Sequence, residues 1–334
     1  MMHITQKIKS IKEKMGNDLC ILAHHYQRDE IVQHADFIGD SLELARKIEG
    51  LNAKYIVMCG VYFMAETSAI LAREDQKVFI PVYNAGCTLA DLAPATLVEM
   101  VLTKLNQKRK IIPIAYVNTS AKVKAICGRF GGSVCTSANS VTMLRWALDN
   151  SDGVLFLPDR HLGINSANAL NLKKEDISFL EGDLFEKDYK LYLWPGLCDV
   201  HQNFRPEHIK MARKQHPEAK VIVHPECPED VVELADEWGS TSKIITYVKQ
   251  LPKGSQIVIG TEINLVNRLK KYHEGEKEIY YLINSSCKHM ATITEDNLFM
   301  LLDSLEKTKP VEVDKETKKF ARLAIEKMLS LCNK

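Results

Sequence analysis

The 334-residue sequence has no long uninterrupted hydrophobic run and no excess of charge of either sign. Its apolar stretches, such as YIVMCGVYFMA, are shorter than the roughly 18 residues that a membrane-spanning helix needs. With 44 basic and 43 acidic residues, and lysines spread over helical patterns, it also lacks the basic stripe typical of nucleic-acid binding. We therefore expect neither a membrane nor a nucleic acid among its partners.

Several familiar signatures are missing as well. The start, MMHITQKIKSIKEKM, has no apolar core of a secretory signal, so we expect a cytoplasmic protein in a reducing compartment. There is no glycine-rich dinucleotide fingerprint and no P-loop, and nucleotide binding is therefore not indicated. No Cys-x-x-Cys pair occurs among the nine cysteines, although structural zinc sites and many iron–sulfur sites use such pairs.

What the chain does contain is one layout repeated three times. Short β-branched or aromatic runs alternate with amphipathic helical patterns, which is typical of βαβ units with parallel sheets. The first strands of the three repeats read LCILAHHY, IIPIAYVN and KVIVHPEC, and the last strands end in YNAGC, WPGLC and INSSC. We predict an α/β protein of three homologous, three-layer, Rossmann-like parallel-sheet domains around a pseudo-threefold axis.

The repeats also predict domain boundaries. We expect a first domain over residues 1–93, a second over 94–205 and a third over 206–293, with the C-terminal helices of 294–334 packed on the first. Ligand groups gather at the carboxyl ends of parallel strands, so the active site should lie at the centre, where the three domains meet.

Each repeat closes on a cysteine: Cys87, Cys198 and Cys287. Three copies around one axis would bring these thiols together as metal ligands. The alternatives are simple burial, which is common for free cysteine, and a nucleophile–base pair of Cys198 with His201. Cys20 and Cys59 lie inside apolar strands and are expected in the core. Of the others, Cys332 is expected at the surface or in packing, and Cys127, Cys135 and Cys227 are ambiguous.

Polar residues two positions apart follow the first strand of each repeat: His24 and Tyr26, Tyr116 and Asn118, His224 and Glu226. Because residues i and i+2 of an extended chain project to the same side, all six could face one cavity. The alternative is that each is bonded into its own loop or solvated, as strand-end polar residues commonly are.

Each pair is followed by a hydroxyl residue at the start of a predicted helix: Ser41, Ser137 and Thr241. Ordinary N-capping explains such residues, since serine and threonine are favoured caps. Three helix N-termini around one cavity would also suit a substrate that carries carboxylates or phosphate.

Three thiolates leave one metal position open, as Lewis-acid catalysis requires. From these residues alone, a Cys₃ zinc site and a 4Fe-4S cluster with one non-cysteine corner remain equal alternatives.

Together, AHHYQ, DFIGDSLELAR, YNAGCTLADLA, AYVNTSAKVKA, CTSAN, PDRHLG, WPGLCDVH, VIVHPEC, GSTS and CKHMATIT resemble quinolinate synthase, in the same order and over nearly the whole chain. The resemblance implies one 4Fe-4S cluster per chain, held by Cys87, Cys198 and Cys287. It also implies an enzyme of NAD biosynthesis that condenses iminoaspartate with dihydroxyacetone phosphate to quinolinate, phosphate and water. Coupling to an enzyme that produces iminoaspartate is one option for its partners.

The resemblance also implies roles for the strand-end residues. Tyr26, Glu226, His201 and His224 would carry proton transfer and positioning. The substrate-binding residues would be His24, Ser41, Tyr116, Asn118, Ser137, His224, Glu226 and Thr241. The sequence departs from some relatives in having Met290 in place of a further cysteine after Cys287, which removes a redox disulfide there, and a reversible pair of Cys127 with Cys135 is less favoured than two ordinary thiols.

Two other functions stay open. One is a zinc or iron–sulfur lyase that acts on another small dicarboxylate. The other is a cluster-bearing electron carrier or redox sensor, against which the six strand-end polar groups argue.

Overall fold

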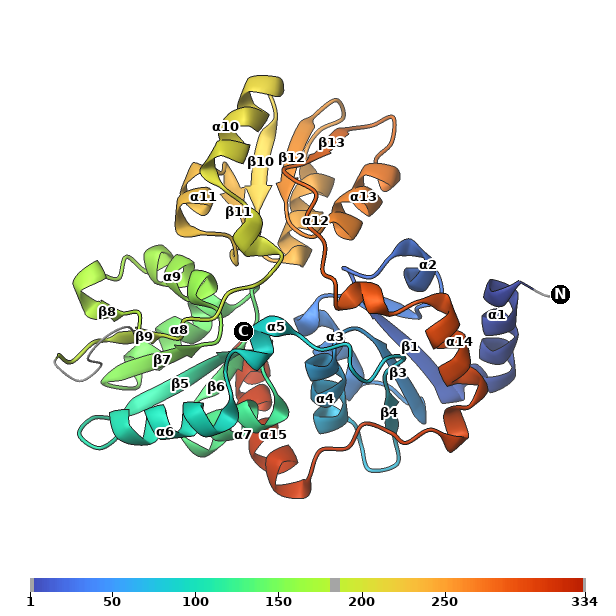
Figure 1. Ribbon diagram of the computed structural model, residues 1–334, viewed down its shortest axis with the longest axis horizontal. Helices are drawn as coiled ribbons and strands as arrows, with labels where there is room; N and C mark the ends of the chain where they lie inside the picture. Colours follow the sequence, from blue (N-terminus) through green and yellow to red (C-terminus); the bar gives the residue numbers. More distant parts are fainter. Residues whose placement is uncertain (1–2, 181–186, 333–334) are drawn as a thin grey trace.

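Three parallel β-sheets account for most of the fold in the computed structural model, which describes residues 3–180 and 187–332. Each sheet takes its strands from one continuous stretch of chain, and Figure 1 shows three lobes around a common centre. We call each sheet with its connecting helices the first, second and third unit. The predicted fold class, three Rossmann-like α/β domains, is confirmed.

The first unit has its strands in the order β2-β1-β3-β4. Its elements are α1 (Ile4–Met15), β1 (Leu19–His24), α2 (Asp29–Val32), β2 (Phe37–Gly39), α3 (Ser41–Glu49), β3 (Tyr55–Cys59), α4 (Tyr62–Leu71) and β4 (Lys77–Phe79). The short helix α5 (Thr88–Asp91) follows directly after Cys87.

The second unit has one more strand, in the order β6-β5-β7-β9-β8. Its elements are α6 (Ala95–Leu105), β5 (Ile111–Tyr116), α7 (Ala121–Arg129), β6 (Ser133–Cys135), α8 (Ser140–Asp149), β7 (Gly153–Leu157), α9 (Arg160–Ala169), β8 (Ile177–Ser178) and β9 (Leu191–Leu193).

The third unit repeats the order of the first, β11-β10-β12-β13. Its elements are α10 (Pro206–Gln215), β10 (Lys220–Val223), α11 (Glu229–Leu234), β11 (Glu237–Trp238), α12 (Thr241–Gln250), β12 (Gln256–Gly260), α13 (Ile263–Tyr272) and β13 (Glu278–Tyr281). The chain ends with α14 (Glu295–Asp303) and α15 (Lys315–Leu331).

The first and third units share detailed contacts as well as strand order. The Asp36 carboxylate accepts a hydrogen bond from the Ile21 backbone N–H at 2.7 Å, and Asp236 accepts one from Val221 at the same distance. A basic residue of the preceding helix pairs with each aspartate, Lys12 at 2.8 Å in the first unit. Such agreement supports a common ancestry of the repeats.

The central strands form because their residues are apolar without a break. All six residues of β1 and all six of β5 are buried, as expected for strands covered by helices on both faces. Helix α4 is buried on nearly every side, since it lies between its own sheet and helices of the second unit. The sheets of the first and second units therefore share one hydrophobic core, whereas the third unit has two core clusters of its own.

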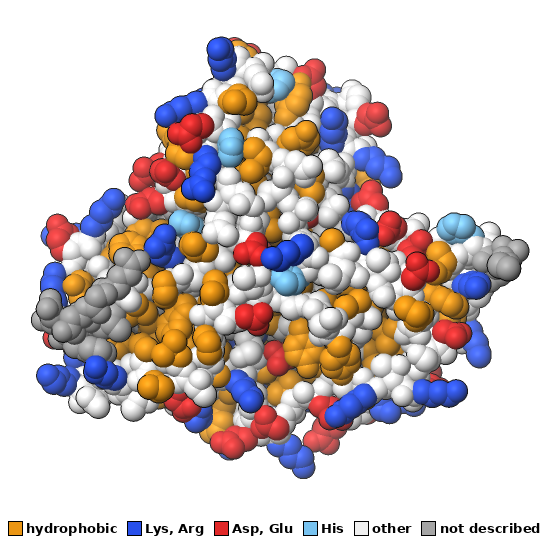
Figure 2. All heavy atoms as spheres, viewed as in Figure 1, with side chains coloured by type: hydrophobic (Ala, Val, Ile, Leu, Met, Phe, Trp, Pro, Cys, Tyr) orange, Lys and Arg blue, Asp and Glu red, His pale blue; other side chains and the backbone are white. Residues whose placement is uncertain are grey.

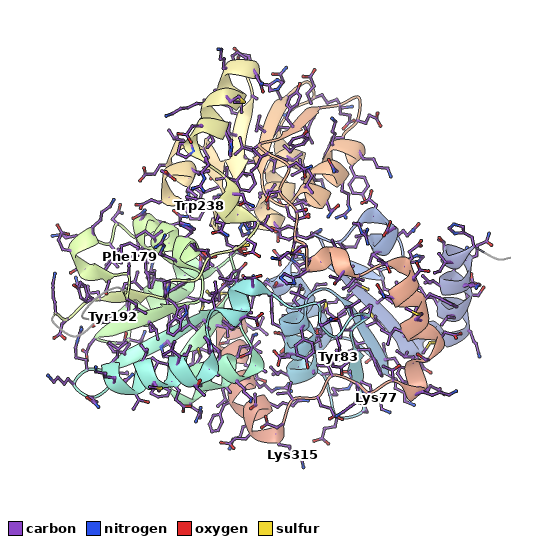
Figure 3. All side chains as sticks on the ribbon, viewed as in Figure 1. Lys77, Tyr83, Phe179, Tyr192, Trp238 and Lys315 are labelled. Atoms are coloured by element: carbon purple, nitrogen blue, oxygen red, sulfur yellow. The ribbon has the colours of Figure 1, made fainter. Side chains whose placement is uncertain are left out.

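The C-terminal helices correct one prediction. Helix α14 packs on α1 of the first unit, as expected, and the Glu295 carboxylate lies 2.6 Å from the His34 ring. The connection to α15 then runs along β4, where the Tyr83 hydroxyl donates to the Pro310 carbonyl at 2.9 Å (Figure 3).

Helix α15, however, packs mainly on α7 and β6 of the second unit (Figure 1). The reason is steric: a side chain at Gly128 would meet the Phe320 carbonyl oxygen at 2.0 Å, so only glycine lets these two helices approach so closely. The placement of 294–334 on the first unit was therefore wrong for α15. The exact domain boundaries stay a prediction.

The surface carries acidic and basic side chains side by side, as Figure 2 shows for one face. Among the described helices, none is both long and apolar enough to cross a membrane.

Candidate active site

A cavity lined by residues of all three units lies where the units meet. Its walls contain every residue that the sequence singled out, namely His24, Tyr26, Ser41, Cys87, Tyr116, Asn118, Ser137, Cys198, His201, His224, Glu226, Thr241 and Cys287. The structure thus brings the predicted site residues together, while their roles remain predictions.

The loops of the three cysteines touch one another through the residues that follow each cysteine. The Thr88 hydroxyl donates to the Asp199 carboxylate at 2.9 Å and lies 3.0 Å from the His289 ring. Lys288 approaches the same carboxylate at 3.3 Å. Because these residues come directly after Cys87, Cys198 and Cys287, the three thiols converge on one side of the cavity.

Burial sets the protonation state of these thiols. It raises the pKa of Cys87 to about 12 and also raises the pKa of Cys287. The pKa of Cys198 is raised well above its ordinary value by burial and by the nearby Glu226 and Asp159 carboxylates. A thiol nucleophile needs a lowered pKa, so the alternative of a Cys198–His201 catalytic pair is disfavoured.

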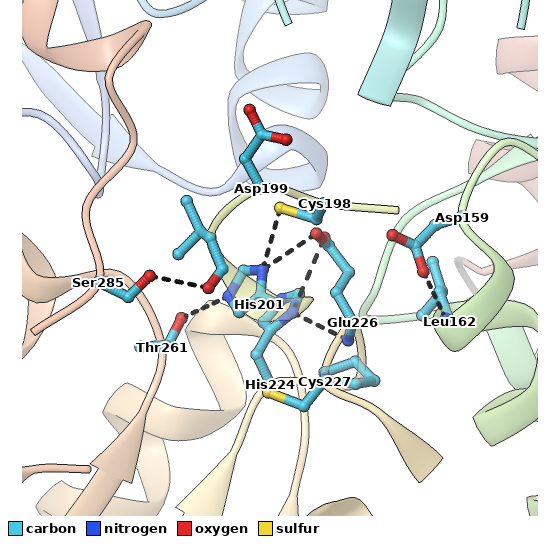
Figure 4. Close-up of polar contacts among 12 residues, drawn as sticks. Asp159, Leu162, Cys198, Asp199, His201, His224, Glu226, Cys227, Thr261 and Ser285 are labelled. Carbon is cyan, nitrogen blue, oxygen red and sulfur yellow. Dashed lines mark hydrogen bonds and ion pairs between the residues drawn. The ribbon is translucent and has the colours of Figure 1, made fainter. Parts of the chain in front are cut away.

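His201 links Cys198 to the acid–base residues (Figure 4). Its Nδ1 lies 3.3 Å from the Cys198 sulfur and 3.1 Å from a Glu226 oxygen, and its Nε2 lies 3.1 Å from the Thr261 hydroxyl. One ligand atom from each of Cys198, His201 and Glu226 falls within 4.8 Å of the others, so these three could hold a metal ion.

Glu226 is only 3 % exposed, yet its surroundings favour the ionised carboxylate. Burial by itself would raise its pKa, but His201, His224 and hydrogen bonds from His201 and Tyr116 hold the pKa of this carboxyl well below its usual range. The Tyr116 hydroxyl donates to Glu226 at 2.5 Å. So many donors keep the carboxylate free of its own proton, although the lowered pKa makes it a weaker base than an ordinary carboxylate.

Tyr26 supplies a phenol that shares the Thr261 hydroxyl with His201. Its hydroxyl lies 2.9 Å from the Thr261 hydroxyl and accepts a hydrogen bond from Thr241 at 3.2 Å. Burial and the Glu226 charge raise its pKa well above 10, so the phenol keeps its proton.

His24 and His224 hold equivalent positions in two units. In each, Nδ1 accepts a hydrogen bond from the backbone N–H two residues later, at 3.1 Å from Tyr26 and 3.3 Å from Glu226. Burial lowers the pKa of both rings to about 3, so both are neutral and leave Nε2–H as their donor.

This geometry corrects the argument for the strand-end pairs, although the pairs do face one cavity. β1 ends at His24 and β10 ends at Val223, so Tyr26 and Glu226 lie in turns beyond the strands. The side-chain-to-backbone hydrogen bond of each histidine, and not the pleat of an extended strand, turns both members of the pair inward.

The three hydroxyl residues are not the helix caps. Asp40 caps α3 and Ser240 caps α12, each one residue earlier than expected, while α8 starts after Asn139 without a side-chain cap. Ser41 and Thr241 therefore keep their side chains for the cavity. The N–H groups of α3 are already bonded to Asp40, so anion binding at that helix start, which the sequence suggested, is disfavoured.

Asn118 brings an unpaired polar atom to the cavity. Its Oδ1 is buried and has no hydrogen-bond partner within the described protein. A buried amide oxygen without a partner is costly, so it is suited to accept a donor from a ligand.

The other cysteines behave as packing residues. Cys20 and Cys59 are buried in β1 and β3, as predicted. Cys127, Cys135 and Cys227 are also buried, and all nine cysteines of the chain are free thiols.

The residues after the third strand of each unit were missed. Thr261 bonds to both Tyr26 and His201, Asp159 lies beside Glu226, and Val61 lines the cavity (Figure 4). Burial and the Glu226 charge raise the Asp159 pKa, and its Oδ2 has no partner. Their shared position within the repeat was the signal that could have found them.

Comparisons with known proteins show the family of the chain. The family model described as quinolinate synthetase A protein matches residues 6–330. The chain is 43 % identical to a quinolinate synthase of Bacillus cytotoxicus, over 97 % of this chain and 92 % of that protein. It is 42 % identical to one of Streptomyces coelicolor, over 98 % of this chain and 88 % of that protein, and 38 % identical to one of Rhodopirellula baltica, over 98 % and 91 %. The chain therefore belongs to the quinolinate synthetase A family.

Proposed function

We propose that this protein is a quinolinate synthase, which condenses iminoaspartate with dihydroxyacetone phosphate to quinolinate, phosphate and water for NAD biosynthesis. The observation that carries the proposal is the single cavity at which three thiols and the acid–base groups of all three units meet in a chain of this family. An electron carrier has no use for such a set of proton donors and acceptors.

The donor set fits a 4Fe-4S cluster held by Cys87, Cys198 and Cys287. Three soft sulfur ligands suit iron–sulfur clusters and zinc. One zinc ion would draw three thiolates to within about 4 Å of one another, since Zn–S bonds are about 2.3 Å. Among the described residues, the three sulfurs do not form a group within 4.8 Å, so they are not arranged around a single zinc ion.

The raised thiol pKa values concern the binding of any metal group at this wall. Without a cation, three thiolates on one buried wall would repel one another, and burial keeps the thiols protonated. Metal binding therefore has to displace the protons. When bound, a cluster with one iron lacking a protein thiolate would supply a Lewis acid that polarises substrate oxygens.

The residues of the chain then divide the proton transfers. Glu226, ionised and bonded to Tyr116, accepts a proton from a carbon that is activated by a neighbouring carbonyl or imine. Tyr26, which keeps its proton, donates to an oxygen that leaves as water. His201 contacts Cys198 and Glu226 and holds both in place. Closing the three units around this cavity keeps the reactive imine from hydrolysis.

The anionic ends of the substrates meet neutral donors. The Nε2–H groups of His24 and His224, and the hydroxyls of Ser41, Ser137 and Thr241, supply hydrogen bonds for carboxylate and phosphate oxygens. Helix α8 begins shortly after Ser137 and has no side-chain cap, which supports a phosphate site near this residue. Asn118 offers its unpaired oxygen to a substrate N–H or O–H.

Anaerobic assays test the proposal directly. Protein reconstituted with iron and sulfide should form quinolinate from iminoaspartate and dihydroxyacetone phosphate, detected by chromatography against a standard. Protein reconstituted with zinc is the control and should form none. A cluster-loaded protein that forms no quinolinate would contradict the proposed reaction.

The ligand assignment has its own test. Cys198→Ser should abolish assembly of the cluster, so iron and sulfide contents and the anaerobic absorption of the cluster should all fall to background. Cys332→Ser is the matched control, because Cys332 is a partly buried thiol directly after α15 that does not line the cavity, and the iron content of this variant should be normal. A normal iron content in Cys198→Ser would remove Cys198 from the ligands.

A further inference from the structure

The loop that follows the first strand of each unit is hydrogen-bonded to a side chain of a neighbouring unit. We call residues 24–29, 116–121 and 224–229 the strand-end loops, because each follows the first strand of its unit. In all three, the bonding side chain comes from the helix after the third strand of another unit. Helix α13 bonds the first loop, α4 the second and α9 the third. The three contacts form a closed ring around the cavity.

Arg268 of α13 holds the loop of Tyr26. The guanidinium group donates to the His25 carbonyl at 2.7 Å and to the Gln27 carbonyl, which are the backbone groups on either side of Tyr26. It also pairs with Asp29 at 2.7 Å, and the side chain is only 4 % exposed. Asn264, one turn earlier on α13, donates to the Tyr26 carbonyl itself.

Asn165 of α9 likewise donates hydrogen bonds to backbone carbonyls of the loop that carries Glu226. Its Nδ2 donates to the Pro225 carbonyl at 2.8 Å and to the Cys227 carbonyl at 2.9 Å, again the groups on either side of the acid–base residue. The side chain is 3 % exposed, so water does not compete for these hydrogen bonds. Asn165 and Arg268 both occupy the sixth position of their helices.

In the second loop, the side chain of the neighbouring unit accepts a hydrogen bond from the loop instead of donating to its carbonyls. Glu66 of α4 accepts a hydrogen bond from the Ala121 backbone N–H at 2.9 Å. The Thr119 carbonyl, next to Asn118, is bonded by the buried Lys124 of the second unit itself. The two loops with proton-transferring residues are thus the two whose flanking carbonyls are held across a unit boundary.

We propose that Arg268 and Asn165 are positioning residues, which set Tyr26 and Glu226 against each other across the cavity by holding the flanking carbonyls from a second unit. The proposal rests on the proposed function for the roles of Tyr26 and Glu226. Neither residue lines the cavity, so neither touches substrate. A displacement of about 1 Å at such a group can lower a rate by about 100-fold, so donors that hold the loops control turnover without touching the reacting atoms.

Paired variants on α9 test whether Asn165 positions Glu226 through its hydrogen bonds to the flanking carbonyls. In iron-loaded protein, Asn165→Ala should lower kcat by about 30- to 100-fold while KM for both substrates changes less than about 3-fold. Asn168→Ala is the control, since Asn168 lies on the same helix and bonds the Glu229 side chain of the third unit, but no carbonyl beside Glu226. It should keep kcat within about 2-fold. Asn165→Ser, which retains a donor, replaces the alanine variant if that variant does not fold.

Paired variants on α13 test whether Arg268 positions Tyr26 through its hydrogen bonds to the flanking carbonyls. Arg268→Gln should lower kcat to a similar degree, and Arg268→Lys should recover part of the loss, since an ammonium group can still donate to one or two carbonyls. Lys271→Gln is the control, because Lys271 is exposed and approaches the same Asp29 carboxylate at 3.7 Å.

Hydrogen exchange separates positioning from general instability, and from failure of the proposed function. In Arg268→Gln, the backbone amides of Tyr26 and Gln27 should exchange at least about 10-fold faster, and in Asn165→Ala those of Glu226 and Cys227, with no change in the β-strands of the other units. Loops with unaltered exchange, or folded variants with unaltered kcat, would each overturn the proposal. If the wild-type protein made no quinolinate, the proposed reaction would be refuted. The exchange data would still show whether Arg268 and Asn165 hold the two loops in place.

Discussion

A carboxylate in a buried cavity is costly unless donors surround it, and Glu226 shows how this site meets that requirement. Tyr116 and His201 both bond it, while the neutral His224 stacks on the His201 ring with centroids 4.4 Å apart. Burial raises the pKa values of Tyr26, Cys198 and Asp159, and the charge of Glu226 raises them further. One residue therefore adds to the effect of burial at three other groups of the site.

Replacing this carboxylate tests its role. Glu226→Gln keeps the size of the side chain but removes the proton acceptor, so turnover should fall by about 100-fold or more while the cluster content stays normal. Glu229→Gln is the control from the same loop, because Glu229 bonds the Asn168 side chain outside the cavity. Full activity in Glu226→Gln would exclude it as the base.

At the scale of helices and strands, small local features decide what reaches the cavity. Asp40 bonds the Leu42 and Glu43 backbone N–H groups and, at the same time, Ser242 of the third unit. This cap leaves the next side chain, Ser41, free to line the cavity. The cap thus connects the start of a helix with the docking of two units.

The contact of α7 with α15 gives a prediction about stability. Gly128→Ala should lower the free energy of unfolding by about 3 kcal/mol, since the new methyl group would overlap the Phe320 carbonyl and force the helices apart. Gly50→Ala is the control, because the nearest atom to its methyl group would be 3.8 Å away, and its effect should stay within about 1 kcal/mol. Urea unfolding of both variants measures the difference, and equal effects would contradict the close approach.

At the scale of the whole molecule, the cysteines make the fold sensitive to alkali. Burial raises the pKa of Cys20, Cys59 and Cys127 from 9.0 to about 12. Above pH 9 the unfolded chain loses these protons while the native state retains them, so stability falls as the pH rises from about 9 towards 12. Lys124, with a pKa lowered to about 8, acts in the opposite direction between pH 8 and 10.5, but it is a single group.

A cysteine variant checks this behaviour. Cys59→Ala should reduce the loss of unfolding free energy between pH 9 and 11, by up to about 1.4 kcal/mol per pH unit, because one native-state proton is removed. Cys332→Ala, at a partly buried thiol, should leave most of the slope unchanged. An unaltered slope in Cys59→Ala would show that this thiol ionises in the native state.

Much of the molecule could be predicted because its signals are local. A run such as LCILAH forms a buried parallel strand wherever it lies, and the cysteine that ends each repeat comes to the carboxyl edge of its sheet. The prediction failed for the packing of α15, which depends on contact between surfaces that are distant in the sequence. The sequence of an amphipathic helix such as α15 shows an apolar face but does not show its partner, and here the absence of a side chain at Gly128 permits the close contact with α7.

The sequence by itself determined three βαβ repeats, the position of one cysteine at the end of each, and the polar residues that follow the first strands, because strand and turn formation depend on neighbours along the chain. Only the tertiary structure decided that Arg268 and Asn165 hold loops of other units, that Thr261 bridges Tyr26 and His201, and that Glu226 is ionised. These features depend on the angle and distance at which separate units meet, and on the burial that results, neither of which any short stretch of residues encodes.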